Sequence, residues 1–154
     1  MKDKLMRAKV LIALFILGAV AACNKDKFTT EPKLTFKSVN GEIFGQGAQV
    51  RFVIGATDKE GDIKDTLWVQ RRSFKCPEFV SDSGVAYPLS PDLVKKNNLD
   101  FEFEVAYNYD VSIAPILVGC SGKDDSCYFR FWIKDDANHT SDTVVSPTIV
   151  LLDQ

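Results

Sequence analysis

The sequence predicts an all-β domain, folded as an antiparallel sandwich of about seven strands in roughly 120 residues. Three segments, 49–56, 99–107 and 127–134, alternate one face against the other with period two, as half-buried strands do. Gly, Pro, Asn and Asp punctuate the chain between such segments, and no helical period extends beyond two turns. Together these observations favour β-structure throughout the domain.

Seven segments carry the strand pattern. In chain order they are 33–39, 49–56, 65–74, 99–107, 111–118, 127–134 and 143–152. The stretch 76–98 contains Pro77, Pro88 and Pro91, so it predicts a loop with at most one helical turn near 91–96. The strand spacing indicates an immunoglobulin-like layout, with a jelly roll or an open barrel as alternatives. Trp68 falls on the third strand, where such domains often bury a tryptophan.

The N-terminus has the layout of a secretory signal. Four basic residues, Lys2, Lys4, Arg7 and Lys9, precede thirteen uncharged residues, 10–22. A helix of that length spans about 20 Å, short of the roughly 30 Å hydrocarbon core, so a permanent transmembrane helix is not expected. The run ends in Val20-Ala21-Ala22-Cys23, which resembles the lipobox of bacterial lipoproteins. The resemblance implies cleavage before Cys23 and acylation of that cysteine, with palmitate among the expected modifications.

This reading divides the chain into a signal peptide (1–22), a lipidated cysteine with a polar linker (23–32) and one β-domain (33–154). Asn24 is not the aspartate that resembles an inner-membrane retention signal, so we expect the outer membrane. Asp26 alone fits the acidic stretch that resembles a surface-export signal. The periplasmic and the surface face therefore both remain open.

Charge and cysteines narrow the function further. The formal net charge of −2 gives no basic footprint for nucleic acid. Export through an oxidising compartment predicts at least one disulfide. Cys120 and Cys127 bracket a polar turn, so we expect them to pair and to leave Cys76 free. The cysteine spacing does not fit a zinc knuckle, and the chain's one histidine, His139, lies elsewhere.

Two motifs resemble bacterial immunoglobulin-like domains. Residues 129–143, FRFWIKDDANHTSDT, followed by 146–151, are similar to the last hairpin of those domains. Residues 55–65, GATDKEGDIKD, are similar to their acidic turn after the second strand. With the lipobox, the chain resembles small Bacteroidetes-type immunoglobulin-like lipoproteins, most of which have no assigned molecular role.

An acidic cluster is the best local candidate for a site. In such a sandwich the loops after the second and sixth strands lie at one end. That arrangement would bring one loop, with Asp58, Glu60, Asp62 and Asp65, toward the other, with Asp135, Asp136 and Asn138. Calcium prefers such oxygen ligands. The alternative is that these residues only shape turns, with no ion and no cofactor.

No catalytic constellation is recognisable, so we expect a protein that is not an enzyme. Glu102 and Glu104 share a strand face about 7 Å apart, but any solvated strand does the same. Tyr87, Tyr107, Tyr109, Tyr128 and Trp132 are candidates for an aromatic contact surface, or else for packing. The expected function is a lipid-anchored binding or accessory module that contacts an envelope protein, a polysaccharide or a host surface. The alternative is a structural subunit of an envelope complex with no external ligand.

Overall fold

A computed structural model describes residues 28–79, 84–89 and 96–153. The expected signal peptide, Cys23, the first part of the expected linker and most of the helical turn expected near 91–96 lie outside these residues. The described chain is all-β, with one short 3-10 turn, η2 (Pro77–Phe79). Within it, no helix is long and apolar enough to cross a membrane.

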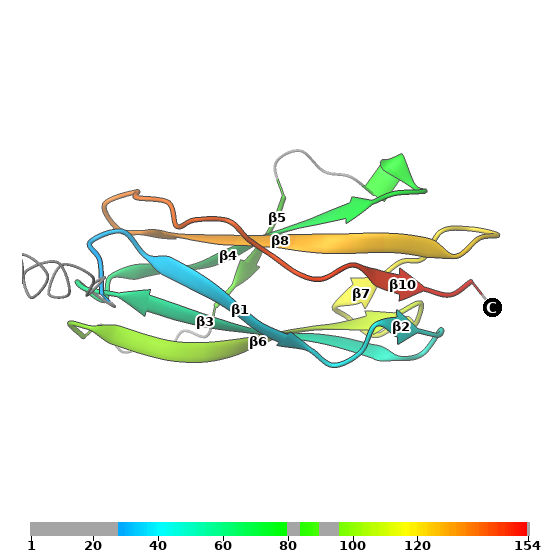
Figure 1. Ribbon diagram of the computed structural model, residues 1–154, viewed down its shortest axis with the longest axis horizontal. Helices are drawn as coiled ribbons and strands as arrows, with labels where there is room; N and C mark the ends of the chain where they lie inside the picture. The colour runs from blue at the N-terminus through cyan, green and yellow to red at the C-terminus, as the bar shows by residue number, and fades with distance from the viewer. Residues whose placement is uncertain (1–27, 80–83, 90–95, 154) are drawn as a thin grey trace, which may run out of the picture.

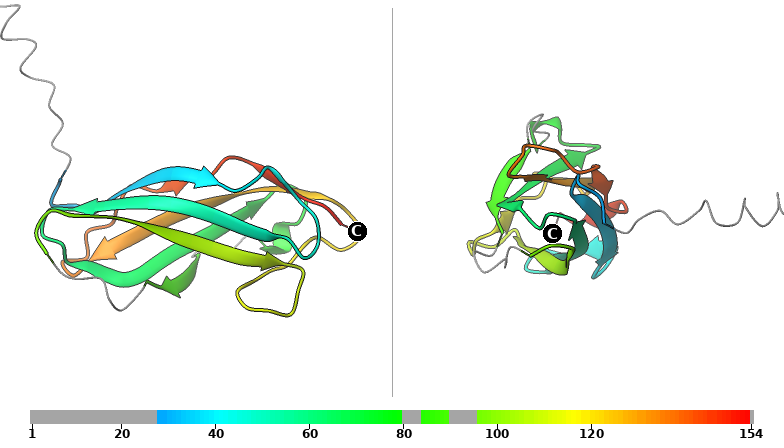
Figure 2. Two further views of the ribbon diagram at one scale, coloured as in Figure 1. Left: turned by 90° about the horizontal axis from the view of Figure 1, so that it is seen from below. Right: turned by 90° about the vertical axis from the view of Figure 1, so that its left-hand side faces the viewer.

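The strands form two sheets that pack face to face, as Figures 1 and 2 show. The first sheet has the order β1-β3-β6-β7, and the second has the order β2-β10-β8-β4-β5, with β9 paired to β8. The strands are β1 (Lys33–Val39), β2 (Ile43–Phe44), β3 (Gln49–Asp58), β4 (Ile63–Ser73), β5 (Val85–Pro88), β6 (Leu99–Tyr109), β7 (Ile116–Leu117), β8 (Asp125–Asp135), β9 (Val144–Val145) and β10 (Ile149–Leu151).

The strand pattern differs from the expected one in three ways. The described residues contain ten strands rather than about seven, because β2 and β5 were not expected and the last segment divides in two. The loop expected over 76–98 is therefore wrong at Val85–Pro88, which pairs with β4 as an edge strand. Two pairings, β10 with β2 and β6 with β7, are parallel, so the sheets are mixed. The segment 143–152 divides into β9 and β10 on either side of Pro147, which lacks the N–H that a continuous ladder requires.

The core lies between the sheets and follows the period-two alternation. Buried and half-buried residues alternate along the whole of β8, which turns Phe129 and Phe131 inward. Phe52 of β3 meets them across the core, with ring centroids 4.8 Å and 5.4 Å away. The inward faces of these two strands confirm the alternation seen in the sequence.

Trp68 corrects one expectation, because it is only half-buried. Its neighbours in β4, Leu67 and Val69, are the residues that enter the core. Trp68 pairs in register with Trp132 of β8, and the Lys134 ammonium lies 5.4 Å from its ring centroid. Since side chains alternate along a strand, burial of Leu67 and Val69 places Trp68 on the outer face.

The described chain begins at one end of the sandwich and finishes at the other (Figure 1). At the first end, the amide of Lys59 donates to the carbonyl of Thr29, so the chain preceding β1 is fixed beside the end of β3.

Candidate functional site

A cleft opens between the sheets at the side where the edge strand β5 faces β6. Its volume is about 370 Å³. The cleft is present because β5 is only four residues long and leaves the inner face of β6 partly uncovered. Most of the side chains that line it are therefore apolar residues of the two inner sheet faces. Among the described residues the lining comprises Leu67, Tyr87, Pro88, Leu89, Phe103, Glu104, Val105, Ala106, Tyr107 and Pro115.

A second hollow of about 220 Å³ continues the cleft along the same side. The two share Tyr87 and Tyr107, whose rings meet edge to face at a centroid distance of 5.8 Å. Burial, together with the side-chain hydrogen bond to Tyr87, raises the pKa of Tyr107 above its usual value. The Tyr107 hydroxyl is therefore a neutral polar group in largely apolar surroundings. The second hollow is lined by Val69, Arg71, Phe79, Val85, Tyr87, Tyr107, Ile116, Leu117, Val118 and Phe129.

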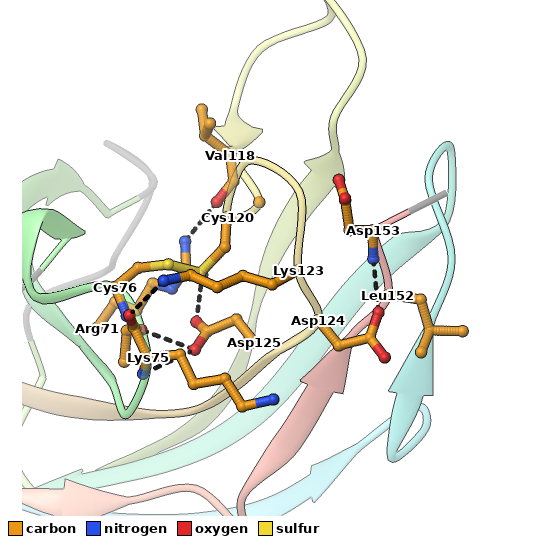
Figure 3. The surroundings of a disulfide bond; sticks show 12 residues. Arg71, Lys75, Cys76, Val118, Cys120, Lys123, Asp124, Asp125, Leu152 and Asp153 are labelled. Atoms are coloured by element: carbon orange, nitrogen blue, oxygen red, sulfur yellow. Dashed lines mark hydrogen bonds and ion pairs between the residues drawn. A yellow bond between two sulfur atoms is a disulfide. The ribbon is translucent and has the colours of Figure 1, made fainter.

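Arg71 is the charged side chain of the second hollow. Its Nη2 donates to Asp125 Oδ2 at 2.7 Å, and its Nη1 donates to the carbonyl of Val118 at 2.5 Å (Figure 3). Its guanidinium also lies 4.8 Å from the ring centroid of Phe79. A buried guanidinium needs such compensation, so Arg71 fixes the floor of the hollow without leaving an unbalanced charge there.

The disulfide corrects the pairing expected from the sequence. Cys76 bonds to Cys120 (Figure 3). Cys127 is free and buried. The register places Ser73 of β4 opposite Cys127 of β8. Because the chain leaves β4 and enters β8 at this end, Cys76 meets Cys120, while Cys127 is buried in the core. The Cys120–Cys127 prediction is therefore wrong, since it assumed that proximity in sequence decides the pairing.

The two acidic loops do lie side by side. The amide of Asp136 donates to the carbonyl of Asp62 at 2.9 Å, and Lys64 Nζ donates to Asn138 Oδ1 at 2.5 Å. Most of the predicted carboxylates do not converge, however. Asp135 accepts from the backbone N–H of His139 and contacts its Nδ1 at 2.7 and 2.6 Å, and Glu60 is exposed.

Ligand atoms for a metal are grouped elsewhere. Among the described residues, the one group of three His, Cys, Asp or Glu ligand atoms within 4.8 Å is Cys76, Cys120 and Asp125. Both sulfurs of that group belong to the disulfide, which removes the thiolates that a metal would bind.

The aromatic candidates separate into two sets. Tyr107 and Tyr109 are buried, and the Tyr109 hydroxyl donates to the carbonyl of Leu152 at 2.9 Å. Burial, with a contribution from Asp110, raises the pKa of Tyr109 to about 12. Tyr128 and Trp132 lie on the outer face of β8, where Trp132 borders a shallow polar hollow with Gln70 and Arg130. Glu102 and Glu104 are exposed, and Glu102 pairs with Lys37.

Comparison with known proteins shows a distant likeness in structure. No family model and no curated protein matches the sequence. The chain is similar to the sporulation control protein Spo0M from Bacillus subtilis, with a TM-score of 0.45 and 10% identity over 82% of this chain. It spans about half of that protein's length, 51%. It is also similar to a Niemann-Pick type C2 protein from the Japanese carpenter ant, with a TM-score of 0.41 and 13% identity over 82% of this chain and 97% of that one.

Sequence reasoning missed the inter-sheet cleft. Its lining comes from several strands and from the segments near Leu89 and Pro115. The alternation in β6 gave a partial signal in the sequence, because it placed Phe101 and Phe103 on the apolar face of the strand. In the structure both side chains remain only half-buried. An apolar face that a short neighbouring strand cannot cover is a mark of such a cleft.

Proposed function

We propose that the chain is a lipid-anchored, non-enzymatic module of the bacterial envelope that binds a small apolar molecule in the inter-sheet cleft. The observation that supports this proposal is the cleft itself. Its volume of about 370 Å³ lies within the range of small-molecule sites. Its lining is largely apolar with few polar groups, which is the usual composition of such sites.

The ligand class follows from the lining. Apolar surface that leaves water contributes about 25 cal/mol per Å², so the walls formed by Leu67, Leu89 and Phe103 favour an apolar ligand. The hydroxyl groups of Tyr87 and Tyr107 lie where the two hollows meet. An elongated, acyl-chain-like molecule would fill both hollows and meet these hydroxyls at its middle or its polar end.

The anchor complements the cleft. Acyl chains on Cys23 would hold the domain at a membrane surface, and more than one chain is needed for stable anchoring. Replacing Cys23 by Ser should abolish palmitate labelling and move the protein from the membrane to the soluble fraction. Labelled, membrane-bound Cys23→Ser protein would contradict the lipoprotein assignment.

Binding is tested on the chain from Asn24 onward, which contains every described element and adds no detergent micelle to the assay. Titration with an apolar fluorescent probe, 1-N-phenylnaphthylamine, should saturate at one site per chain. Unlabelled fatty acid should displace the probe. A signal that rises without saturation, or that fatty acid leaves unchanged, would contradict binding in the cleft.

A structural role in an envelope complex is the second candidate. The observation that favours it is a set of exposed aliphatic side chains at the second hollow, Val85, Ile116 and Val118. Neighbouring exposed apolar residues often mark a surface that a partner covers. Protease added to intact cells separates a surface-displayed module from a periplasmic subunit, because only the first is cleaved before the outer membrane is opened.

A further inference from the structure

Two aspartates at opposite ends of the β3–β4 loop have carboxylate oxygens that no described residue satisfies. Asp58 is the last residue of β3 and is fully buried. Its Oδ2 accepts the backbone N–H groups of Gly61 and Asp62 at 2.5 and 3.1 Å. Its Oδ1 and the Oδ1 of Asp62 are both buried with no hydrogen-bond partner among the described residues.

The two carboxyl groups lie close together, with Asp58 buried and Asp62 half-buried. Burial raises the pKa of Asp58 above its usual value, and the hydrogen-bonding proximity and charge of Asp62 act in the same direction. A buried carboxylate without compensation is costly. Two basic groups at this end are engaged elsewhere, because Lys64 donates to Asn138 and His139 contacts Asp135. Glu31 and Asp62 both lie close enough to raise the pKa of His139. Lys59 belongs to the same loop and is exposed.

We propose that Asp58 and Asp62 bind a hard divalent cation, Ca²⁺ being the best fit, through their Oδ1 atoms. Calcium accepts carboxylates, backbone carbonyls and water in variable geometry. The Lys96 carbonyl approaches this loop at Gly61, where an added Cβ would lie 1.9 Å from its oxygen. The proposed site includes fewer residues than the acidic cluster predicted from the sequence. Asp135 and Asn138 already have partners, and Glu60 is exposed.

A shared proton is the competing explanation, since one proton between the two carboxyl groups would also satisfy both orphaned oxygens. The two explanations differ in what stabilises the folded chain. A bound cation makes stability depend on calcium concentration at neutral pH. A shared proton makes stability rise as the solution is acidified, with no response to calcium.

The test uses the full chain in detergent, with Tm measured by tryptophan fluorescence at neutral pH and constant ionic strength. Calcium, added after treatment with a chelator, should raise Tm by roughly 5–10 °C at saturation. Magnesium in a parallel series should give a smaller rise, because it dehydrates reluctantly. An equal or larger magnesium response would overturn the assignment to calcium.

Three variants locate the response. Asp58→Asn should fold, because the amide oxygen can accept from Gly61 while its N–H₂ donates to Asp62, but it should lose the calcium response. Asp62→Asn should lose the response as well and serves if the first variant is unstable. Glu60→Gln removes the same charge from an exposed position of the same loop and should keep the full response.

Several outcomes would overturn the proposal. They are a wild-type Tm that calcium leaves unchanged, a full response in both aspartate variants, or an equal loss in Glu60→Gln. Stabilisation by acid alone would assign the pair to a shared proton instead. The site lies in a loop apart from the cleft, so these results are independent of probe binding there.

Discussion

Arg71 of β4 and Asp125 of β8 form an ion pair inside the protein, with Nη2 and Oδ2 2.7 Å apart and side chains 9% and 0% exposed. Ser73 Oγ donates to the other carboxylate oxygen at 2.7 Å. The backbone N–H of Lys75 also points to that oxygen, at 3.3 Å. Asp125 therefore fixes the end of β4 and the chain toward Cys76, while Arg71 holds the segment at Val118.

Removing one partner of this pair should be far more damaging than removing an exposed pair. Asp125→Ala leaves the Arg71 guanidinium buried without a counter-charge, so we expect a loss of about 3–5 kcal/mol in the free energy of unfolding. Glu102→Ala breaks the solvent-exposed contact with Lys37 and should cost about 0–1 kcal/mol. Urea denaturation of both variants measures the difference, and equal losses would contradict it.

The cysteines should react according to the structural pairing. A peptide map under non-reducing conditions should contain a Cys76–Cys120 link and no Cys120–Cys127 link. Cys127 should be alkylated only in denaturant, because it is buried and burial raises the pKa of its thiol to about 11. Replacing Cys76 and Cys120 by Ser should cost about 2–4 kcal/mol of stability, the usual range for a disulfide. Fast alkylation of Cys127 in the folded state would contradict the assignment.

His139 should make stability depend on pH in a defined direction. Hydrogen bonding to Asp135 raises the pKa of His139 above its ordinary value of 6.5. The pair's stabilisation is therefore fully present below 6.5 and is lost as pH rises through the higher folded-state pKa. His139→Asn should remove this dependence. An NMR titration of the chain's single histidine checks the direction, and a value below 6.5 would contradict the pair.

Two glycines should differ in their tolerance of a methyl group. Gly61 and Gly47 both have positive φ, +68° and +83°, so alanine is strained at either position by about 1–2 kcal/mol. At Gly47 a Cβ would meet nothing within 4 Å, whereas at Gly61 it would lie 1.9 Å from the Lys96 carbonyl oxygen. Gly61→Ala should therefore lower Tm more than Gly47→Ala, and a thermal melt showing equal decreases would contradict the close approach.

The period-two alternation predicted which face of the long strands is buried. The inward faces of β3 and β8 follow directly from their sequences, because period two fixes which side chains share a face. Most of the segment 111–118 does not form a strand; only Ile116 and Leu117 pair with β6. A segment forms a strand only where a second strand lies beside it to accept its backbone hydrogen bonds. The sequence of the segment alone does not reveal that partner.

The sites required knowledge of which strands are neighbours. Cys76 and Cys120 are separated by 44 residues and meet because β4 pairs with β8. The cleft arises because β5 is too short to cover β6. The acidic loops were easier to place, since hairpin ends at one edge of a sandwich are adjacent by topology. Which of their carboxylates lack partners depends on side-chain packing.

The central claim, ligand binding in the cleft, is tested most directly by filling the cleft. Val105 lines it from the inner face of β6, while Val53 of β3 is half-buried between two core residues and does not. Titration of both phenylalanine variants with 1-N-phenylnaphthylamine compares a blocked cleft with a matched control. We predict that Val105→Phe weakens probe binding at least tenfold, equivalent to about 1.4 kcal/mol, and that Val53→Phe binds as the wild type does. Equal affinities in the two variants would contradict the cleft as the binding site.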